Sequence, residues 1–226
     1  GAFTSSFGNL ATENDKKRMY SVYRKSCFVM NSLAFICCAG FIACIQDFIY
    51  IVFGSNFVLS FSCVLILVFS MLIYLLDIPI ISVQNAMGLH RCDAGVMIIQ
   101  AVLAIACGYG AGKVWGMEGI LLGLTIPTVI FTFIHKGIVI SKVAFEVTSY
   151  KYLKDMGSDL IKGIVIIGVI SAICNCIPAW NPVIAMILKG ILSVIISGIL
   201  IIAFSFKSEY FKETLAMLMR VLKLQK

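Results

Sequence analysis

A polar stripe follows the longest apolar run of this sequence and holds its first candidate for chemistry, Asp77. No charged residue occurs in Phe57–Leu76, and a helix of that length rises roughly 30 Å, the thickness of a bilayer core. On a helix, Asp77 shares a face with Tyr74 and Gln84, and Asn85 lies beside Gln84. These groups could contact a polar substrate or a coupling ion. Alternatively, Asp77 is solvated or paired with a lysine, and its polar neighbours make ordinary interhelical hydrogen bonds.

Two prolines inside predicted helices are hinge candidates. Proline has no amide hydrogen, so Pro79 frees the carbonyl of Leu75 and Pro127 frees the carbonyl of Gly123. Each proline is predicted to bend its helix. In lipid a freed carbonyl needs a partner, so the bend would face another helix or a cavity. Such a kink serves either close packing or hinging.

Metal and acid–base chemistry need clustered acidic, histidine or cysteine side chains, which this sequence lacks. The nine cysteines lie mostly in apolar runs and are predicted to be small buried side chains rather than disulfides. Cys174-Asn175-Cys176 has no second ligand pair nearby. The acidic residues in the predicted cytoplasmic loops between the spans are scattered: Asp93, Glu146, Asp155 and Asp159. We therefore predict no enzyme, no metal site and no cofactor.

The amino-acid composition indicates what kind of structure must position these residues. The chain has 226 residues, of which 61% are hydrophobic and only 13% charged, a balance that excludes an ordinary soluble domain. The sequence therefore predicts an all-α, polytopic transmembrane bundle of about six spanning helices. The predicted spans are Ser26–Gln46, Phe57–Leu89, Asp93–Ala111, Met117–Ser141, Asp159–Ile177 and Pro182–Phe206.

Six spans place the loops on alternating sides, and the basic residues then gather on one of them. Of the 18 lysines and arginines, only Lys113 and Lys189 fall on the other side. The positive-inside rule makes the basic side cytoplasmic and predicts a cytoplasmic C-terminus. Topology therefore accounts for the net charge of +7, and nucleic-acid binding is not needed.

The two ends of the sequence are predicted to differ. Gly1–Leu10 is no signal peptide and resembles the end of an earlier helix, so we expect the chain to be the C-terminal part of a longer protein. Lys207–Lys226 is predicted to form an amphipathic helix on the inner leaflet. Its apolar face would carry Phe211, Leu215, Leu218 and Leu222.

Three stretches, taken in order, carry a resemblance to one family. They are Phe7–Ala11, Phe48–Ser55 followed by Asn85–Leu89, and Gly116–Thr125. The set resembles the C-terminal half of Wzx-like polysaccharide-biosynthesis flippases of the multidrug/oligosaccharidyl-lipid/polysaccharide exporter superfamily. The resemblance implies an alternating-access lobe at residues 1–152, two additional transmembrane helices at 153–206 and a cytoplasmic tail at 207–226. One departure is Gln100, where family members commonly carry asparagine.

The resemblance also implies a function, namely translocation of undecaprenyl-pyrophosphate-linked oligosaccharide across a bacterial plasma (inner) membrane. The expected partners are this lipid-linked oligosaccharide, membrane lipids and a missing N-terminal lobe. Cations near a central cavity would hold the pyrophosphate. Arg91 and Lys189 are candidates, although either could instead snorkel to the lipid headgroups. The alternatives are an ion-coupled multidrug or cation exporter, or a membrane scaffold that transports nothing.

Overall fold

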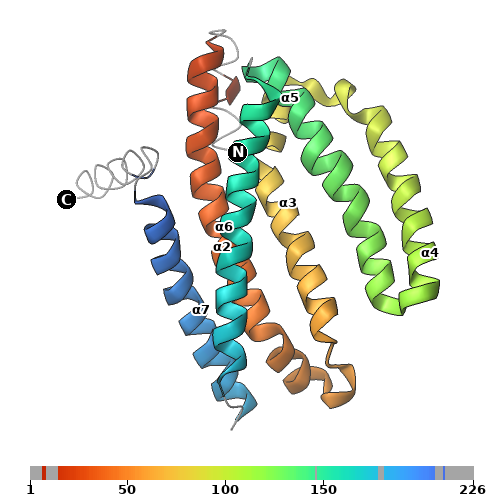
Figure 1. Ribbon diagram of the computed structural model, residues 1–226, viewed down its shortest axis with the longest axis vertical. Helices are drawn as coiled ribbons and strands as arrows, with labels where there is room; N and C mark the ends of the chain where they lie inside the picture. The colour runs from red at the N-terminus through yellow and green to blue at the C-terminus, as the bar shows by residue number, and fades with distance from the viewer. Residues whose placement is uncertain (1–6, 9–14, 146, 178–180, 207–210, 212–226) are drawn as a thin grey trace.

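The computed structural model describes residues 7–8, 15–145, 147–177, 181–206 and 211 (Figure 1). In these ranges the regular structure is entirely helical, and five helical segments are long and apolar enough to cross a membrane. The helices are α2 (Lys16–Phe53), α3 (Phe61–Met87), α4 (Ala94–Pro127), α5 (Gly137–Phe145), α6 (Ser149–Asn175) and α7 (Pro182–Ser205). A π-helical segment, Thr128–Lys136, joins α4 to α5. This arrangement confirms the all-α class.

Side chains at three helix starts accept hydrogen bonds from the free backbone amides there. Asp15 accepts from the Arg18 amide ahead of α2, Ser60 from the Cys63 amide ahead of α3, and Asn181 from the Val183 amide ahead of α7. Gly88 ends α3 in the left-handed conformation, at φ 66°. These local signals fix where the long apolar helices begin and end.

The segment Ala94–Phe145 is a hairpin folded at Gly116. Gly116 has φ 61° and ψ −134° inside α4, a conformation that side chains disfavour. Glycines let the two arms approach closely: a Cβ added to Gly119 would overlap the backbone of Ala111, and one added to Gly123 the backbone of Gly108. The chain therefore runs down one arm of α4 and back up the other (Figure 1).

Helix α2 occupies the centre of the bundle and packs against α3, α6 and α7 (Figure 1). One apolar core lies between these helices and includes Phe35, Leu72, Ile166 and Ile170. A second core lies toward the start of α2 and includes Tyr20, Tyr23, Phe145 and Tyr152. The rings of Tyr23 and Phe145 lie 4.8 Å apart between centroids.

Two segments predicted to lie outside the spans are parts of helices. Helix α2 begins ten residues before the predicted Ser26, and α6 begins at Ser149 rather than Asp159. Three residues of the extended start of α2, Met19, Tyr20 and Tyr23, are buried in the second core. Apolar packing on one face thus extends each helix past its charged residues.

The predicted helix remnant at Gly1–Leu10 and the amphipathic tail at Lys207–Lys226 lie almost wholly outside the described residues.

The hairpin has the most exposed apolar surface of the spanning segments. Of the residues in its most apolar 18-residue stretch, only 6% are buried, against 44% in the corresponding stretch of α3. Ile98, Val102 and Ile105 are 68%, 61% and 72% exposed. Such a surface suits contact with lipid or with another apolar partner.

Candidate functional site: buried ion pairs between the helices

The predicted polar stripe on α3 divides between the interior and the outside of the bundle. Asp77 and Gln84 are only 2% and 6% exposed, whereas Tyr74 is 63% exposed. Asn85 is exposed too. Helix geometry accounts for the division, because Tyr74 and Asn85 lie about 60–80° around the axis from Asp77. The interior site on this helix therefore consists of Asp77 and Gln84 alone.

Asp77 forms a buried ion pair with Lys136. The Lys136 ammonium donates to Asp77 Oδ2, and the lysine and aspartate side chains are 5% and 2% exposed. The lysine-paired alternative for Asp77 is thus the one that the structure contains. Removing both charges from water costs several kcal/mol per ion, which their mutual attraction offsets only when both stay in place.

The π-helical segment carries Lys136 into the interior. Its two buried residues are Phe133 and Lys136, and the next residue, Gly137, lies so close to Tyr152 that a Cβ there would overlap the tyrosine ring. The charge count places Lys136 with the surface cations, whereas the structure buries it. Its partner is 59 positions away in sequence, so no local pattern could reveal the pair.

The two hinge candidates lie on different helices, Pro79 on α3 and Pro127 at the end of α4. Helix α3 continues through Pro79, which is buried. Pro127 ends α4 where the π-helical segment begins, and the neighbouring Gly123 serves close packing against the first arm. Gln100 holds the two arms together: it accepts from Thr132 Oγ1 at 2.7 Å and donates to Thr128 Oγ1 at 3.4 Å.

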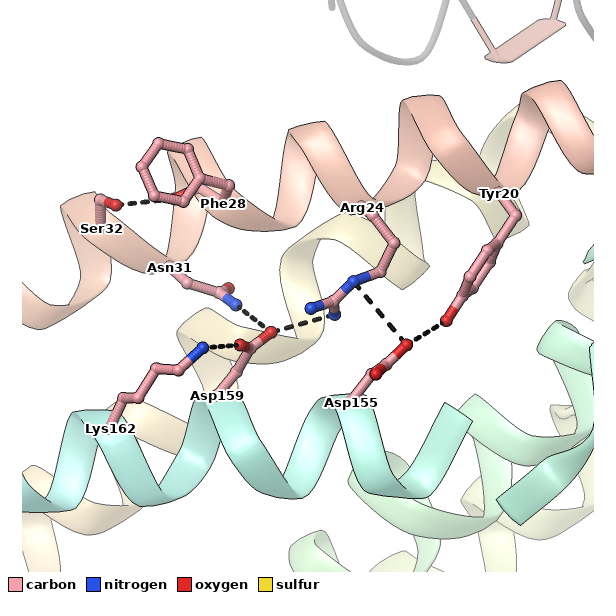
Figure 2. Close-up of polar contacts among 8 residues, drawn as sticks. All are labelled: Tyr20, Arg24, Phe28, Asn31, Ser32, Asp155, Asp159 and Lys162. Atoms are coloured by element: carbon pink, nitrogen blue, oxygen red, sulfur yellow. Dashed lines mark hydrogen bonds and ion pairs between the residues drawn. The ribbon is translucent and has the colours of Figure 1, made fainter. Parts of the chain in front are cut away.

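A second polar cluster joins α2 to α6 (Figure 2). Arg24 lies 3.0 Å from Asp159 Oδ2 and 4.0 Å from Asp155 Oδ2. Asn31 donates to Asp159 at 3.2 Å, and the Tyr20 hydroxyl donates to Asp155 at 2.5 Å. Figure 2 shows the α2 side chains reaching toward the two carboxylates of α6. In the sequence both aspartates fall among scattered acidic residues, and only their spacing of four, which places them on one helix face, hints at a common role.

Lys162 adds a second cation to this cluster, at 3.2 Å from Asp159 Oδ1. It lines a pocket of about 50 Å³ between α2, α6 and the end of α7, together with Arg24, Ser32, Phe204 and others. The α2–α6 cluster therefore borders a polar space on the α7 side.

Asp77 and the α2–α6 cluster border one small cavity. Its walls include Asp77 from α3, Phe133 from the π-helical segment, Asn31 from α2 and Asp155 from α6. The cavity has a volume of about 10 Å³. Asp77 and the α2–α6 cluster, which are distant in sequence, thus face the same small cavity.

The remaining predicted cations lie elsewhere. Lys189 forms an ion pair with Asp47 at 2.7 Å that joins α7 to α2. Its ammonium is therefore held between two helices and does not extend unpaired toward the lipid headgroups. Arg91 is exposed in the short connection between α3 and α4. The structure therefore does not bring Asp77, Arg91 and Lys189 together.

No group of three or more potential metal ligands occurs in the described part of the chain. The eight cysteines that can be described are free thiols. The predicted burial holds for Cys27, Cys38, Cys63 and Cys174 and is wrong for Cys37, Cys107 and Cys176, which are exposed. Comparison of the chain with family models, curated proteins and solved structures found no match. Its class is therefore defined by its own geometry: an all-helical bundle of membrane-spanning length with ion pairs buried between the helices.

Proposed function

We propose that this chain is the C-terminal lobe of an alternating-access transporter in the bacterial plasma membrane. Its cargo would be undecaprenyl-pyrophosphate-linked oligosaccharide, flipped to the outer leaflet for surface polysaccharide assembly. In this proposal the hairpin crosses the membrane twice, which gives six crossings and a cytoplasmic C-terminus. The exposed apolar hairpin would then face lipid or the other lobe.

The set of ion pairs buried between α2, α3, α6 and the π-helical segment carries the transporter part of the proposal. Buried ion pairs add little net stability compared with apolar packing, so a bundle that needed only stability would gain little from them. Charged residues inside spanning segments commonly mark transport pathways. The Asp77–Lys136 pair and the α2–α6 cluster together place such charges on four elements.

The cargo is supported by the sequence resemblance and by the positions of the cations. Arg91 is exposed at the basic end of the bundle, where a pyrophosphate arriving from the inner leaflet would be met. Asp77 would position Lys136, and Lys189 would hold α7 against α2. An exporter of cationic drugs would want a carboxylate with free negative charge, but Lys136 neutralises Asp77.

The test uses the full-length protein in its native host, with surface glycan and lipid-linked precursor measured together. Arg91→Ala should lower surface glycan and let precursor accumulate, whereas the matched Arg91→Lys should retain part of the activity because it keeps the charge. Both variants must be present in the membrane at the wild-type level. Normal glycan in the deletion strain with altered drug susceptibility would point to the exporter instead, and no change in either would point to the scaffold.

A further inference from the structure

Two residues that line the cavity between the ion-pair clusters each carry a buried oxygen that accepts no hydrogen bond from the described part of the chain. Asp77 Oδ1 and Asn31 Oδ1 belong to residues that line this cavity, and neither oxygen has a hydrogen-bond partner in the described part of the chain. Their residues are 2% and 6% exposed. A buried acceptor without a donor costs about 1–3 kcal/mol, so a bound molecule that donates to both would remove a considerable penalty.

The size of the cavity limits what that molecule can be. The cavity has a volume of about 10 Å³, close to the roughly 10–15 Å³ that one buried water requires. Water is stable in a cavity only where polar partners surround it, and Tyr20, Arg24 and Asp155 also line these walls. A purely apolar cavity of the same size would stay dry.

The charges around the cavity favour a neutral ligand over a cation. Asp77, Asp155 and Asp159 line the cavity, and each is already within ion-pair distance of a lysine or an arginine. Arg24 also lines the cavity, and its positive charge disfavours a metal ion there. Water carries no charge and has two hydrogens for the two free acceptors.

We infer that this cavity binds one ordered water molecule, which donates hydrogen bonds to Asp77 Oδ1 and Asn31 Oδ1. The water joins the Asp77–Lys136 pair to the α2–α6 cluster as one hydrogen-bonded network. Asn31 completes the link, because its amide donates to Asp159. The network then reaches from Lys136 to Asp155, whose side chain is 32% exposed. This site does not depend on the cargo of the protein.

A cryo-electron microscopy map that resolves ordered water tests the site directly. The full-length protein in lipid nanodiscs would be imaged in choline chloride and again in sodium chloride. We expect a peak within hydrogen-bond distance of both oxygens in both salts. A peak that appears only with sodium would overturn the inference in favour of a sodium site, and an empty cavity in both maps would overturn it as well.

Coupling between the clusters gives an independent test by thermal unfolding. Asn31→Leu would be made in the wild-type protein and in the double variant Asp77→Leu/Lys136→Met, which lacks one of the two acceptors. We expect the fall in Tm caused by Asn31→Leu to be clearly smaller in the double variant, because the bridging water is already lost there. Equal falls in both backgrounds would overturn the inference.

Ser32→Ala is the matched control for this comparison. Ser32 is the next residue of α2, donates to the Phe28 carbonyl at 2.7 Å and lines the neighbouring pocket instead. Its effect on Tm should be the same in both backgrounds. An effect of Ser32→Ala that also shrinks in the double variant would show general loosening and overturn the water-specific interpretation.

Discussion

The buried pair of Asp77 and Lys136 makes each charge depend on the other, because removing one charge alone lowers the free energy of unfolding. Both side chains are at least 95% buried, so a charge left without its partner could not reach bulk solvent. The attraction between the two compensates for the burial of each. The pair thus fixes the register of α3 against the π-helical segment.

Removing one partner should therefore harm the protein more than removing both. Lys136→Met leaves the Asp77 carboxylate buried and unpaired, and we expect a loss of about 3–5 kcal/mol in the free energy of unfolding. The double variant Asp77→Leu/Lys136→Met should recover most of this loss, because apolar side chains of similar size fill the space. Thermal and denaturant unfolding of the purified full-length protein would measure both.

Tyr74→Phe is the matched control on the same helix, since Tyr74 is 63% exposed and should contribute little to stability. A Lys136→Met variant as stable as the wild type would show that the pair does not hold the helices together. A double variant no better than the single one would show that the charges themselves are needed for folding.

At the level of the elements, the α4 hairpin depends on close contact between backbones. Gly123 faces the backbone of Gly108 across the two arms, whereas a Cβ on Gly110 would meet nothing within 4 Å. Small residues allow helices to approach in this way in membranes, where dispersion contacts replace the hydrophobic drive for association. The two arms are therefore held together at glycines such as Gly123, and Gly110 takes no part in this contact.

Alanine substitution should separate these glycines. Gly123→Ala places a methyl group inside the opposite arm, and we expect a loss of about 1–3 kcal/mol through overpacking or separation of the arms. Gly110→Ala should be neutral or stabilise slightly, because alanine favours the helix and the space is open. Unfolding of the two variants side by side would measure the difference, and equal stability would contradict the close contact between the arms.

The elements also show what the sequence could predict and where it failed. Long apolar runs give spanning helices without tertiary information, and the sequence therefore predicts the long helices of the described residues, although not the extended starts of α2 and α6. The position of Asp77 at the end of an apolar run leaves pairing with a lysine as one of several alternatives. Lys136 was not identifiable as the partner, since the contact spans 59 positions. The π-helical segment that turns Lys136 inward has no reliable local signature either.

In the whole molecule, the connections between the long helices lie at two opposite ends of the bundle. The turn after α2 and the fold of the hairpin at Gly116 lie at one end of the bundle, and the connection between α3 and α4 lies at the other (Figure 1). Basic side chains are frequent at the second end, which carries Lys16, Lys17, Arg18 and Arg91. The positive-inside rule would place that end in the cytoplasm.

Cysteine labelling in intact cells would test this orientation and the double crossing of the hairpin. In a variant without the nine native cysteines, Asn56→Cys and Val114→Cys should react with a membrane-impermeant maleimide from outside. His90→Cys and Tyr150→Cys should react only after permeabilisation. All four wild-type side chains are exposed, so differences in labelling would report sidedness rather than burial.

Tyr74→Cys serves as the control for lipid exposure, because Tyr74 is exposed in the middle of α3 and should react in neither condition. Labelling of Val114→Cys only after permeabilisation would contradict two crossings by the hairpin and reduce the bundle to fewer spans. Reversal of all four results would keep the spans but invert the protein. The basic end would then face outward, and Arg91 could not meet a cargo at the inner leaflet.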